Sequence, residues 1–137
     1  MIFLIELDSK SFGMTFKNYI KLKGLKMLIA ITSTGDTQDA LVNEKFGRCQ
    51  YFIIVDPDTM ELEAVPNPAE QAQGGAGPKA AEAIINKGVN ILLTGHVGDK
   101  AEEALKRGNI KIIDGLTGNL KIRDAITNYL SKQKQEN

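Results

Sequence analysis

Histidine and cysteine each occur once in this sequence, and both can bind metal. His96 is flanked by glycines, so an accessible imidazole is expected there, able to ligate a metal, donate a hydrogen bond or exchange a proton near neutral pH. Cys49 follows Arg48, whose charge favours the thiolate, the metal-binding form of cysteine. A surface-loop histidine and a small buried cysteine are the alternatives. The candidate metal ligands are therefore Cys49 and His96, and for Cys49 both interpretations stay open.

A glycine-rich segment precedes a predicted helix that starts at Pro78 and ends before Gly88. Glycines allow a ligand close to the backbone, and a helix start offers unpaired N–H groups and a positive dipole end, so the segment suits an anion. It matches neither the P-loop nor the dinucleotide fingerprint, and a simple turn before a helix-starting proline is the alternative. Arg48 adds a planar donor fork for an anion, or else makes a surface ion pair. The candidate anion-binding residues here are Arg48, Gly74, Gly75, Gly77 and Lys79.

The loop Gly95-His96-Val97-Gly98 follows an apolar run at 89–94, which is typical of a buried strand. In open α/β sheets, ligands bind outside the carboxyl ends of the parallel strands. We therefore add Gly95 and Gly98 to the candidate cofactor-binding residues. The loops 33–46 and 115–119 are expected at the same edge.

The elements that position these residues follow the order β-β-β-α-β-α-β-α. Strands are predicted at 28–31, 51–55, 62–66, 89–94 and 110–113, and the second and third form a hairpin around Asp56-Pro57. The later helices begin near Asp99 and after the 115–119 turn. Alternation of strands and helices predicts parallel strands joined by right-handed crossovers. The expected fold is a five-stranded mixed sheet with helices on both faces.

Composition restricts the function. The 137 residues fit one compact domain, and 17 basic residues balance 17 acidic ones, which argues against a general nucleic-acid binder. No apolar run approaches the roughly 20 residues that span a bilayer. No serine-nucleophile motif is present, and Asp56 and Asp114 are isolated acids at strand ends. These features suit binding better than catalysis.

The first 26 residues differ from the rest in charge. They carry five lysines against Glu6 and Asp8, a net +3, and residues 27–137 compensate with a net −3. A buried strand directly after Met27 suggests that the domain is 27–137, with 1–26 an N-terminal extension that is a start-site artefact or a leader. A real N-terminal arm that packs on the domain or on a partner is the alternative.

Several motifs together resemble the dinitrogenase iron–molybdenum cofactor biosynthesis family, which includes NifX/NafY-type accessory proteins and small stand-alone domains. The motifs are Phe46-Gly47-Arg48, Tyr51-Phe52, Asn67-Pro68, Gly74-Gly75-Ala76-Gly77 and Leu93-Thr94-Gly95-His96-Val97-Gly98. The resemblance covers residues 28–131. It implies a ribonuclease-H-like αβα sandwich with strand order 3-2-1-4-5 and strand 2 antiparallel.

The resemblance also implies a function: non-catalytic binding or carriage of an anionic metal–sulfur cluster, either iron–sulfur or molybdenum-containing, or of its precursor. One related protein carries a molybdenum–copper sulfide cluster. The implied setting is cytoplasmic, with cluster donor and acceptor proteins as partners, no nucleic acid or membrane, and a monomer or weak homodimer. Many members have a histidine just before the Phe-Gly-Arg motif, whereas this chain has Glu44-Lys45 there. Family members often have alanine or another small residue where this chain has Cys49.

Two other functions remain as alternatives. One is a metal-dependent nuclease or phosphotransferase on the ribonuclease-H-like scaffold, which requires several carboxylates around one site. The other is a protein-interaction domain that pairs through the edge of its hairpin.

Overall fold

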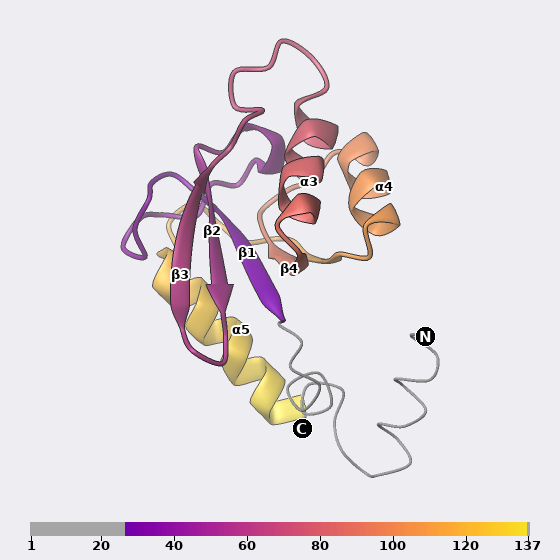
Figure 1. Ribbon diagram of the computed structural model, residues 1–137. Coiled ribbons are helices and arrows are strands. Elements are labelled where there is room, and N and C mark those ends of the chain that lie inside the picture. The colour runs from indigo at the N-terminus through magenta and orange to yellow at the C-terminus, as the bar shows by residue number, and fades with distance from the viewer. Residues whose placement is uncertain (1–26, 137) are drawn as a thin grey trace, which may run out of the picture.

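A computed structural model describes residues 27–136 as a mixed sheet between helices (Figure 1). The predicted extension 1–26 lies outside the described residues. The strands are β1 (Leu28–Ser33), β2 (Tyr51–Asp56), β3 (Glu61–Pro66), β4 (Val89–Leu93) and β5 (Lys111–Ile113). The helices are the 3₁₀ turn η1 (Phe46–Arg48), α3 (Ala76–Asn86), α4 (Asp99–Arg107) and α5 (Ile122–Glu136).

The strand order is β3-β2-β1-β4-β5. Strand β2 runs antiparallel to β1 and β3, whereas β1, β4 and β5 are parallel to one another. This confirms the predicted five-stranded mixed sheet with strand 2 antiparallel, the ribonuclease-H-like arrangement that the resemblance implies. Since β1 and β4 are neighbours, the loops at their carboxyl ends lie close together.

Burial along each strand follows its place in the sheet. The central strand β1 is buried at every position from Ile29 to Ser33 because helices cover both faces of the sheet. The edge strand β3 is mostly exposed and ends at Pro66, which cannot donate to a ladder. The hairpin pairing of β2 with β3 confirms the predicted hairpin.

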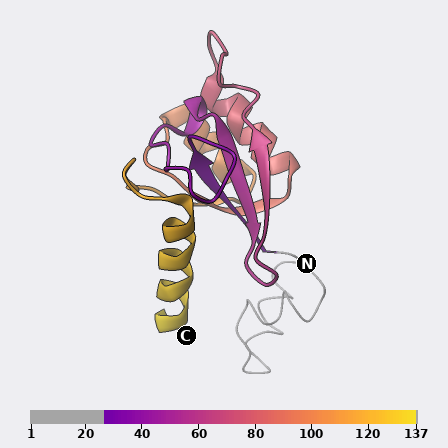
Figure 2. The same cartoon turned by 90° about the vertical axis from the view of Figure 1, so that its left-hand side faces the viewer.

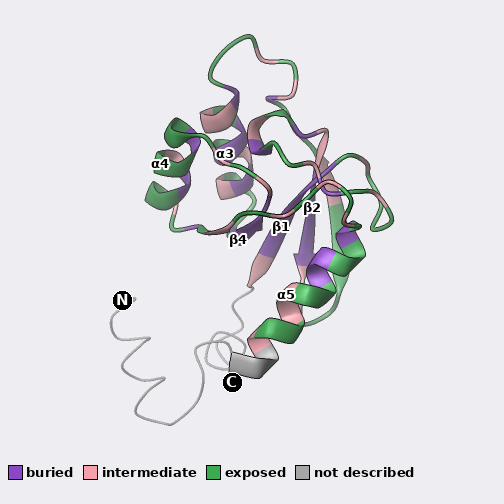
Figure 3. Ribbon diagram, turned by 180° about the vertical axis from the view of Figure 1, so that it is seen from behind, coloured by how far each residue is buried: buried purple, intermediate pink, exposed green. Residues whose placement is uncertain are grey.

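Two hydrophobic clusters lie on opposite faces of the sheet. Helices α3 and α4 cover one face, and α5 covers the other and runs past the ends of the strands (Figure 2). Figure 3 shows buried residues concentrated in the strands and on the inner sides of the helices. Within residues 27–136, no helix is long and apolar enough to cross a membrane.

Helix α3 begins at Ala76, two residues before the predicted start at Pro78. Gly75 precedes it with a φ of 66°, a left-handed conformation that suits glycine. Pro78 is therefore the third helical residue. It is tolerated because the first N–H groups of a helix have no partner within the helix.

Candidate anion-binding pocket

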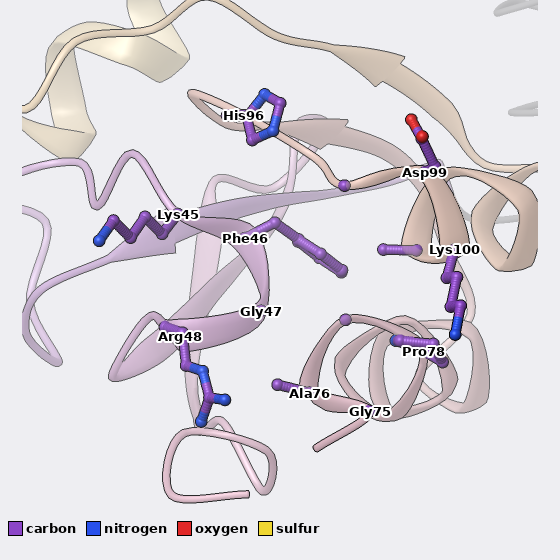
Figure 4. Close-up of a pocket in the computed structure, with 13 residues that line it drawn as sticks. Lys45, Phe46, Gly47, Arg48, Gly75, Ala76, Pro78, His96, Asp99 and Lys100 are labelled. Carbon is purple, nitrogen blue, oxygen red and sulfur yellow. The ribbon is translucent and has the colours of Figure 1, made fainter. Parts of the chain in front are cut away.

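A pocket of about 430 Å³ lies where η1, the start of α3 and the loop before α4 meet (Figure 4). Its lining residues come from three segments that are distant in the sequence. They are Lys45, Phe46, Gly47, Arg48, Gly75, Ala76, Gly77, Pro78, His96, Gly98, Asp99, Lys100 and Ala101. The pocket therefore sits beside the carboxyl end of β4, the edge at which the sequence predicts a ligand.

The floor of the pocket is apolar. Phe46 is 1% exposed, and its ring lies 5.6 Å from the ring of Phe52, centroid to centroid. Ala76 and Ala101 are also buried, and both line the pocket. A bound group therefore meets a phenyl ring and methyl groups at the bottom of the pocket.

Two glycines allow the three segments to approach closely. A Cβ atom on Gly77 would lie 2.8 Å from the Cβ atom of Ala101, which is too close for van der Waals contact. A Cβ atom on Gly47 would lie 3.1 Å from the backbone nitrogen of Gly77. Glycine at both positions therefore lets η1, α3 and α4 converge on one cavity.

Two helices begin at this cavity. The N-cap residues are Gly75 for α3 and Gly98 for α4, and neither cap makes a side-chain hydrogen bond. The first N–H groups of each helix therefore have neither an intrahelical partner nor a capping side chain. With the positive ends of both helix dipoles, they favour an anion in the pocket.

The side chains at the rim add positive charge. Lys45, Arg48 and Lys100 line the pocket against a single carboxylate, that of Asp99. All four residues are exposed. In Figure 4, Lys100 extends toward Pro78, whereas Lys45 extends outward from the rim. The local balance of charge is therefore positive in a chain whose net charge is zero.

His96 is held by its backbone and leaves its side chain exposed. Its N–H donates to the Glu44 carbonyl at 2.7 Å, and its carbonyl accepts from the Phe46 N–H at 3.2 Å. Within residues 27–136 the imidazole has no hydrogen-bond partner, so its nitrogens are available to a ligand. Gly95 permits this pairing, because a Cβ atom there would lie 2.6 Å from the Cα atom of Glu44.

Cys49 lies in the core below the pocket and is not among the lining residues. It is fully buried in the cluster that includes Phe46 and Phe52. The Asn67 side-chain amide donates to the Cys49 carbonyl at 2.9 Å. Burial raises the pKa of the Cys49 thiol to about 12, so the thiolate is disfavoured. The structure therefore favours the small buried cysteine over the metal ligand, the two alternatives that the sequence left open.

The structure brings some predicted site residues together and separates others. Those that line the pocket are Arg48, Gly75, Gly77, His96 and Gly98. Those that do not are Gly74, Lys79, Gly95 and Cys49. Lys79 follows Pro78 and lies about 100° further round helix α3, so its exposed side chain is on a different side of the helix from the pocket.

Eight lining residues were not predicted as site residues, and three of them bear on the argument: Lys45, Gly47 and Lys100. Lys100 lies in the first turn of the helix after the His96 loop, so the reasoning that selected Lys79 beside the glycine-rich loop would also have selected Lys100. Gly47 is the centre of the Phe-Gly-Arg motif. It lets η1 approach the start of α3, and this role could not be predicted without knowing that Gly77 lies beside it.

The described residues hold no clustered metal-binding site of their own. Within 27–136, no three side chains of His, Cys, Asp or Glu come together around a point where a metal ion would fit. The carboxylate cluster that a metal-dependent nuclease requires is thus not found in this part of the chain. A metal in the pocket would depend mainly on ligands that it brings with it.

Comparison with known proteins agrees with this fold. Residues 26–132 match the family described as dinitrogenase iron-molybdenum cofactor. The apo form of the orange protein from Desulfovibrio gigas is similar, with a TM-score of 0.75 and 40% sequence identity over 79% of this chain and 90% of that one. A NifB-like protein from Thermotoga has a TM-score of 0.67 and 32% identity over 77% of this chain and 88% of its own.

A more distant relative comes from Methanocaldococcus jannaschii. This uncharacterized protein is 29% identical over 96 residues, which span 68% of this chain and 76% of the relative.

Proposed function

This chain belongs to the dinitrogenase iron-molybdenum cofactor family, and from that premise we propose that it is a non-catalytic carrier of an anionic metal–sulfur cluster or its precursor. The observation that carries the proposal is the convergence of two uncapped helix starts on one apolar-floored pocket with a cationic rim. The family description names a metal cofactor, and the structure of the similar orange protein is an apo form.

The pocket suits sulfide better than a compact oxyanion. Sulfide-rich clusters spread their charge over large, weakly hydrated atoms, so contact with the Phe46 ring incurs a smaller desolvation penalty. The free N–H groups of α3 and α4 can donate to bridging or terminal sulfides. Lys45 and Lys100 are long enough to follow clusters of different shape, because their stems rotate freely.

The cluster is held mainly by charge and hydrogen bonds rather than by covalent ligands. Cys49 is buried with a raised pKa, so we no longer propose it as a ligand. His96 is the proposed protein ligand, because its imidazole is exposed at the rim and has no partner within residues 27–136. One imidazole can occupy an open position on a metal whose other ligands are sulfides. Iron–sulfur and molybdenum-containing clusters both meet this description.

Carriage of this kind implies partners. A cargo held without thiolate bonds can leave without breaking metal–cysteine links, so transfer to an acceptor protein needs only exchange of the single His96 bond and competition for the anion. We therefore propose cluster donor and acceptor proteins as the physiological partners. Lys79 and the backbone around Gly74 lie beside the pocket, where they can contact a larger cargo or a docked partner.

Anaerobic reconstitution tests the proposal. The protein is incubated either with tetrathiomolybdate and Cu(I) or with ferrous iron and sulfide, then desalted. We expect visible absorbance, with metal and acid-labile sulfide retained in fixed proportion to protein. The double variant Lys45→Ala/Lys100→Ala should weaken retention by about tenfold. In water, a lysine about 5 Å from one negative charge of the cargo attracts it by roughly 0.8 kcal/mol, and the variant loses two such lysines.

A matched control is Lys132→Ala, which removes an exposed cation from α5, far along the chain from the pocket segments. It should retain cargo like the unaltered protein. If the unaltered protein keeps no metal from either mixture, the carrier function is wrong. If Lys132→Ala loses as much cargo as the double variant, binding is nonspecific attraction and the assignment to the pocket is wrong.

A further inference from the structure

Arg48 is bound to a loop of its own chain. Its Nη1 atom donates to the Glu70 carbonyl at 3.2 Å and to the Ala72 carbonyl. These two carbonyls belong to the segment 67–75, which joins the end of β3 to the start of α3. In Figure 4 the guanidinium extends from η1 toward that segment. Part of the donor capacity of Arg48 is thus already used within the protein.

The first half of this segment has other anchors. The Asn67 side-chain amide donates to the carbonyls of Gly47 at 3.1 Å and Cys49 at 2.9 Å. Its Oδ1 atom accepts from the Ala69 N–H at 2.9 Å, and Ala69 is fully buried. These contacts fix residues 67–69 against the core.

In the second half, Arg48 is the side chain that anchors the backbone. Among the described residues, no other side chain makes a hydrogen bond to the stretch 70–75. This stretch ends in Gly74 and Gly75, whose backbones lose the most conformational freedom when they are ordered. Gly75 is also the N-cap of α3, so the position of this stretch sets where α3 begins at the pocket.

We propose that Arg48 is a positioning residue, which fixes the segment 67–75 and thereby the start of α3, while Lys45 and Lys100 supply the side-chain charge that attracts the cargo. The inference rests on the proposed function. It assigns different tasks to three cations that look equivalent as lining residues. Lys45 and Lys100 have no ion pair within residues 27–136, so their charge is fully available to an anion.

The substitution Arg48→Lys separates the two tasks. Lysine keeps the positive charge, but its Nζ lies one bond nearer the backbone than the Nη1 atom that donates to both carbonyls, so it does not reach the same position. If Arg48 is a direct counter-ion, Arg48→Lys should bind like the unaltered protein and Arg48→Ala should not. If Arg48 positions the loop, both variants should lose affinity and both should loosen the loop.

Hydrogen exchange in the absence of cargo is the first measurement. The amides of Glu70 and Ala72 are bonded within the segment, to the carbonyls of Asn67 and Ala69. We expect both to exchange about tenfold faster in Arg48→Lys and Arg48→Ala, as the loss of two hydrogen bonds predicts. The control Lys100→Ala should leave their exchange unchanged. Thermal unfolding curves check that each variant is folded.

Titration with tetrathiomolybdate at low and high salt is the second measurement. Arg48→Lys and Arg48→Ala should both weaken binding several-fold, and Arg48→Lys, which keeps the charge, should keep the salt dependence of the unaltered protein. Lys100→Ala should weaken binding and reduce the salt dependence, because it removes a charge that faces the anion.

Two results overturn the inference. One is unchanged exchange of the Glu70 and Ala72 amides in both Arg48 variants. The other is an Arg48→Lys variant that binds like the unaltered protein while Arg48→Ala loses both affinity and salt dependence. If the unaltered protein does not bind tetrathiomolybdate, the proposed function is wrong, and so are the binding roles of Lys45 and Lys100. The exchange measurement still decides whether Arg48 holds the loop, because it is made without cargo.

Discussion

The two faces of the sheet differ in the size of the side chains that cover them. The face under α3 and α4 is rich in small buried residues, whereas the face under α5 is packed with branched aliphatic ones. The small residues include Ala30, Ala69, Ala76, Ala80, Ala81 and Ala101. The branched ones include Ile29, Ile31, Ile53, Val55, Ile91, Leu93, Ile122 and Ile126.

The helix starts on the two faces also differ. The first amides of α5 are covered by the chain itself, since the N–H of Ile122 donates to the Ala40 carbonyl and that of Arg123 to the Gln38 carbonyl, both at 2.9 Å. The starts of α3 and α4 have no side-chain cap. A helix start can bind an anion only when its N–H groups remain free, so the candidate site lies on the α3 and α4 face and not on the α5 face.

Large-to-small substitutions on each face should separate stability from binding. Ile126→Ala and Leu105→Ala each remove three carbon atoms from a buried side chain. Each should lower the free energy of unfolding by about 2–5 kcal/mol, measured by chemical denaturation. Affinity for tetrathiomolybdate should fall in Leu105→Ala, which loosens α4, and stay unchanged in folded Ile126→Ala. Equal losses of affinity in both variants would contradict the division between faces.

A methyl group at the junction of α3 and α4 should have a smaller effect on stability and a clear effect on binding. In Gly77→Ala the new Cβ atom meets Ala101 at 2.8 Å, so the helix starts must move apart. Overpacking of about 1–3 kcal/mol is partly offset by the better helix propensity of alanine, about 1 kcal/mol. We expect a net loss of stability near 1 kcal/mol in thermal unfolding and a loss of tetrathiomolybdate binding.

The control for Gly77→Ala is Gly74→Ala. A Cβ atom on Gly74 has no atom within 4 Å, so both stability and affinity should stay unchanged. If the two variants bind alike, close approach at Gly77 is not what forms the pocket.

An effect confined to pH values above 9 concerns Cys49, which is buried on the face of small residues. Its pKa is about 12 in the folded protein, against 9.0 for an unperturbed thiol. Below pH 9 both states keep the proton, and between pH 9 and 12 only the folded state does, so stability falls as pH rises. The loss should be about 1.4 kcal/mol at pH 10.

Denaturation of the unaltered protein and of Cys49→Ala at pH 8 and pH 10 isolates this effect, because the other titrating groups are common to both. The difference in unfolding free energy between the two proteins should shrink by that amount. A constant difference would show that the thiol ionises in the folded state, and Cys49 would return as a candidate ligand.

Much of the fold was predictable because apolar runs in the sequence coincide with the buried strands of the sheet. The run Tyr51-Phe52-Ile53-Ile54-Val55 became β2, and the apolar run after Val89 became β4. The start of α3 was misplaced because Pro78 is a common first helical residue, whereas here the left-handed Gly75 lets the helix begin at Ala76. The turn η1 was not predicted, since Phe-Gly-Arg has no helical pattern of its own.

The site was less predictable because it depends on which side of each helix faces the pocket and on how distant segments pack together. His96 and Gly98 follow the end of β4, so their position was predicted from the strand alone. Lys100 faces the pocket only because α4 starts beside α3, and Lys79 does not face it because of its phase on the helix. Cys49 is buried in one cluster with Phe46 and Phe52, and these neighbours in the sequence do not by themselves show whether the thiol faces the core or the pocket.

The parallel pairing of β1 with β4 has a consequence for the order of folding. The hairpin of β2 and β3 joins neighbours in the chain, whereas the pairing of Leu28 with Val89 closes a loop of about sixty residues, a slow step with a large entropic barrier. The pocket needs Phe46, Gly77 and His96 together, so it forms only after that closure. A nascent chain therefore gains the surface of the pocket late. Because β4 is paired on both sides, its opening requires global unfolding, so the pocket lasts as long as the fold does.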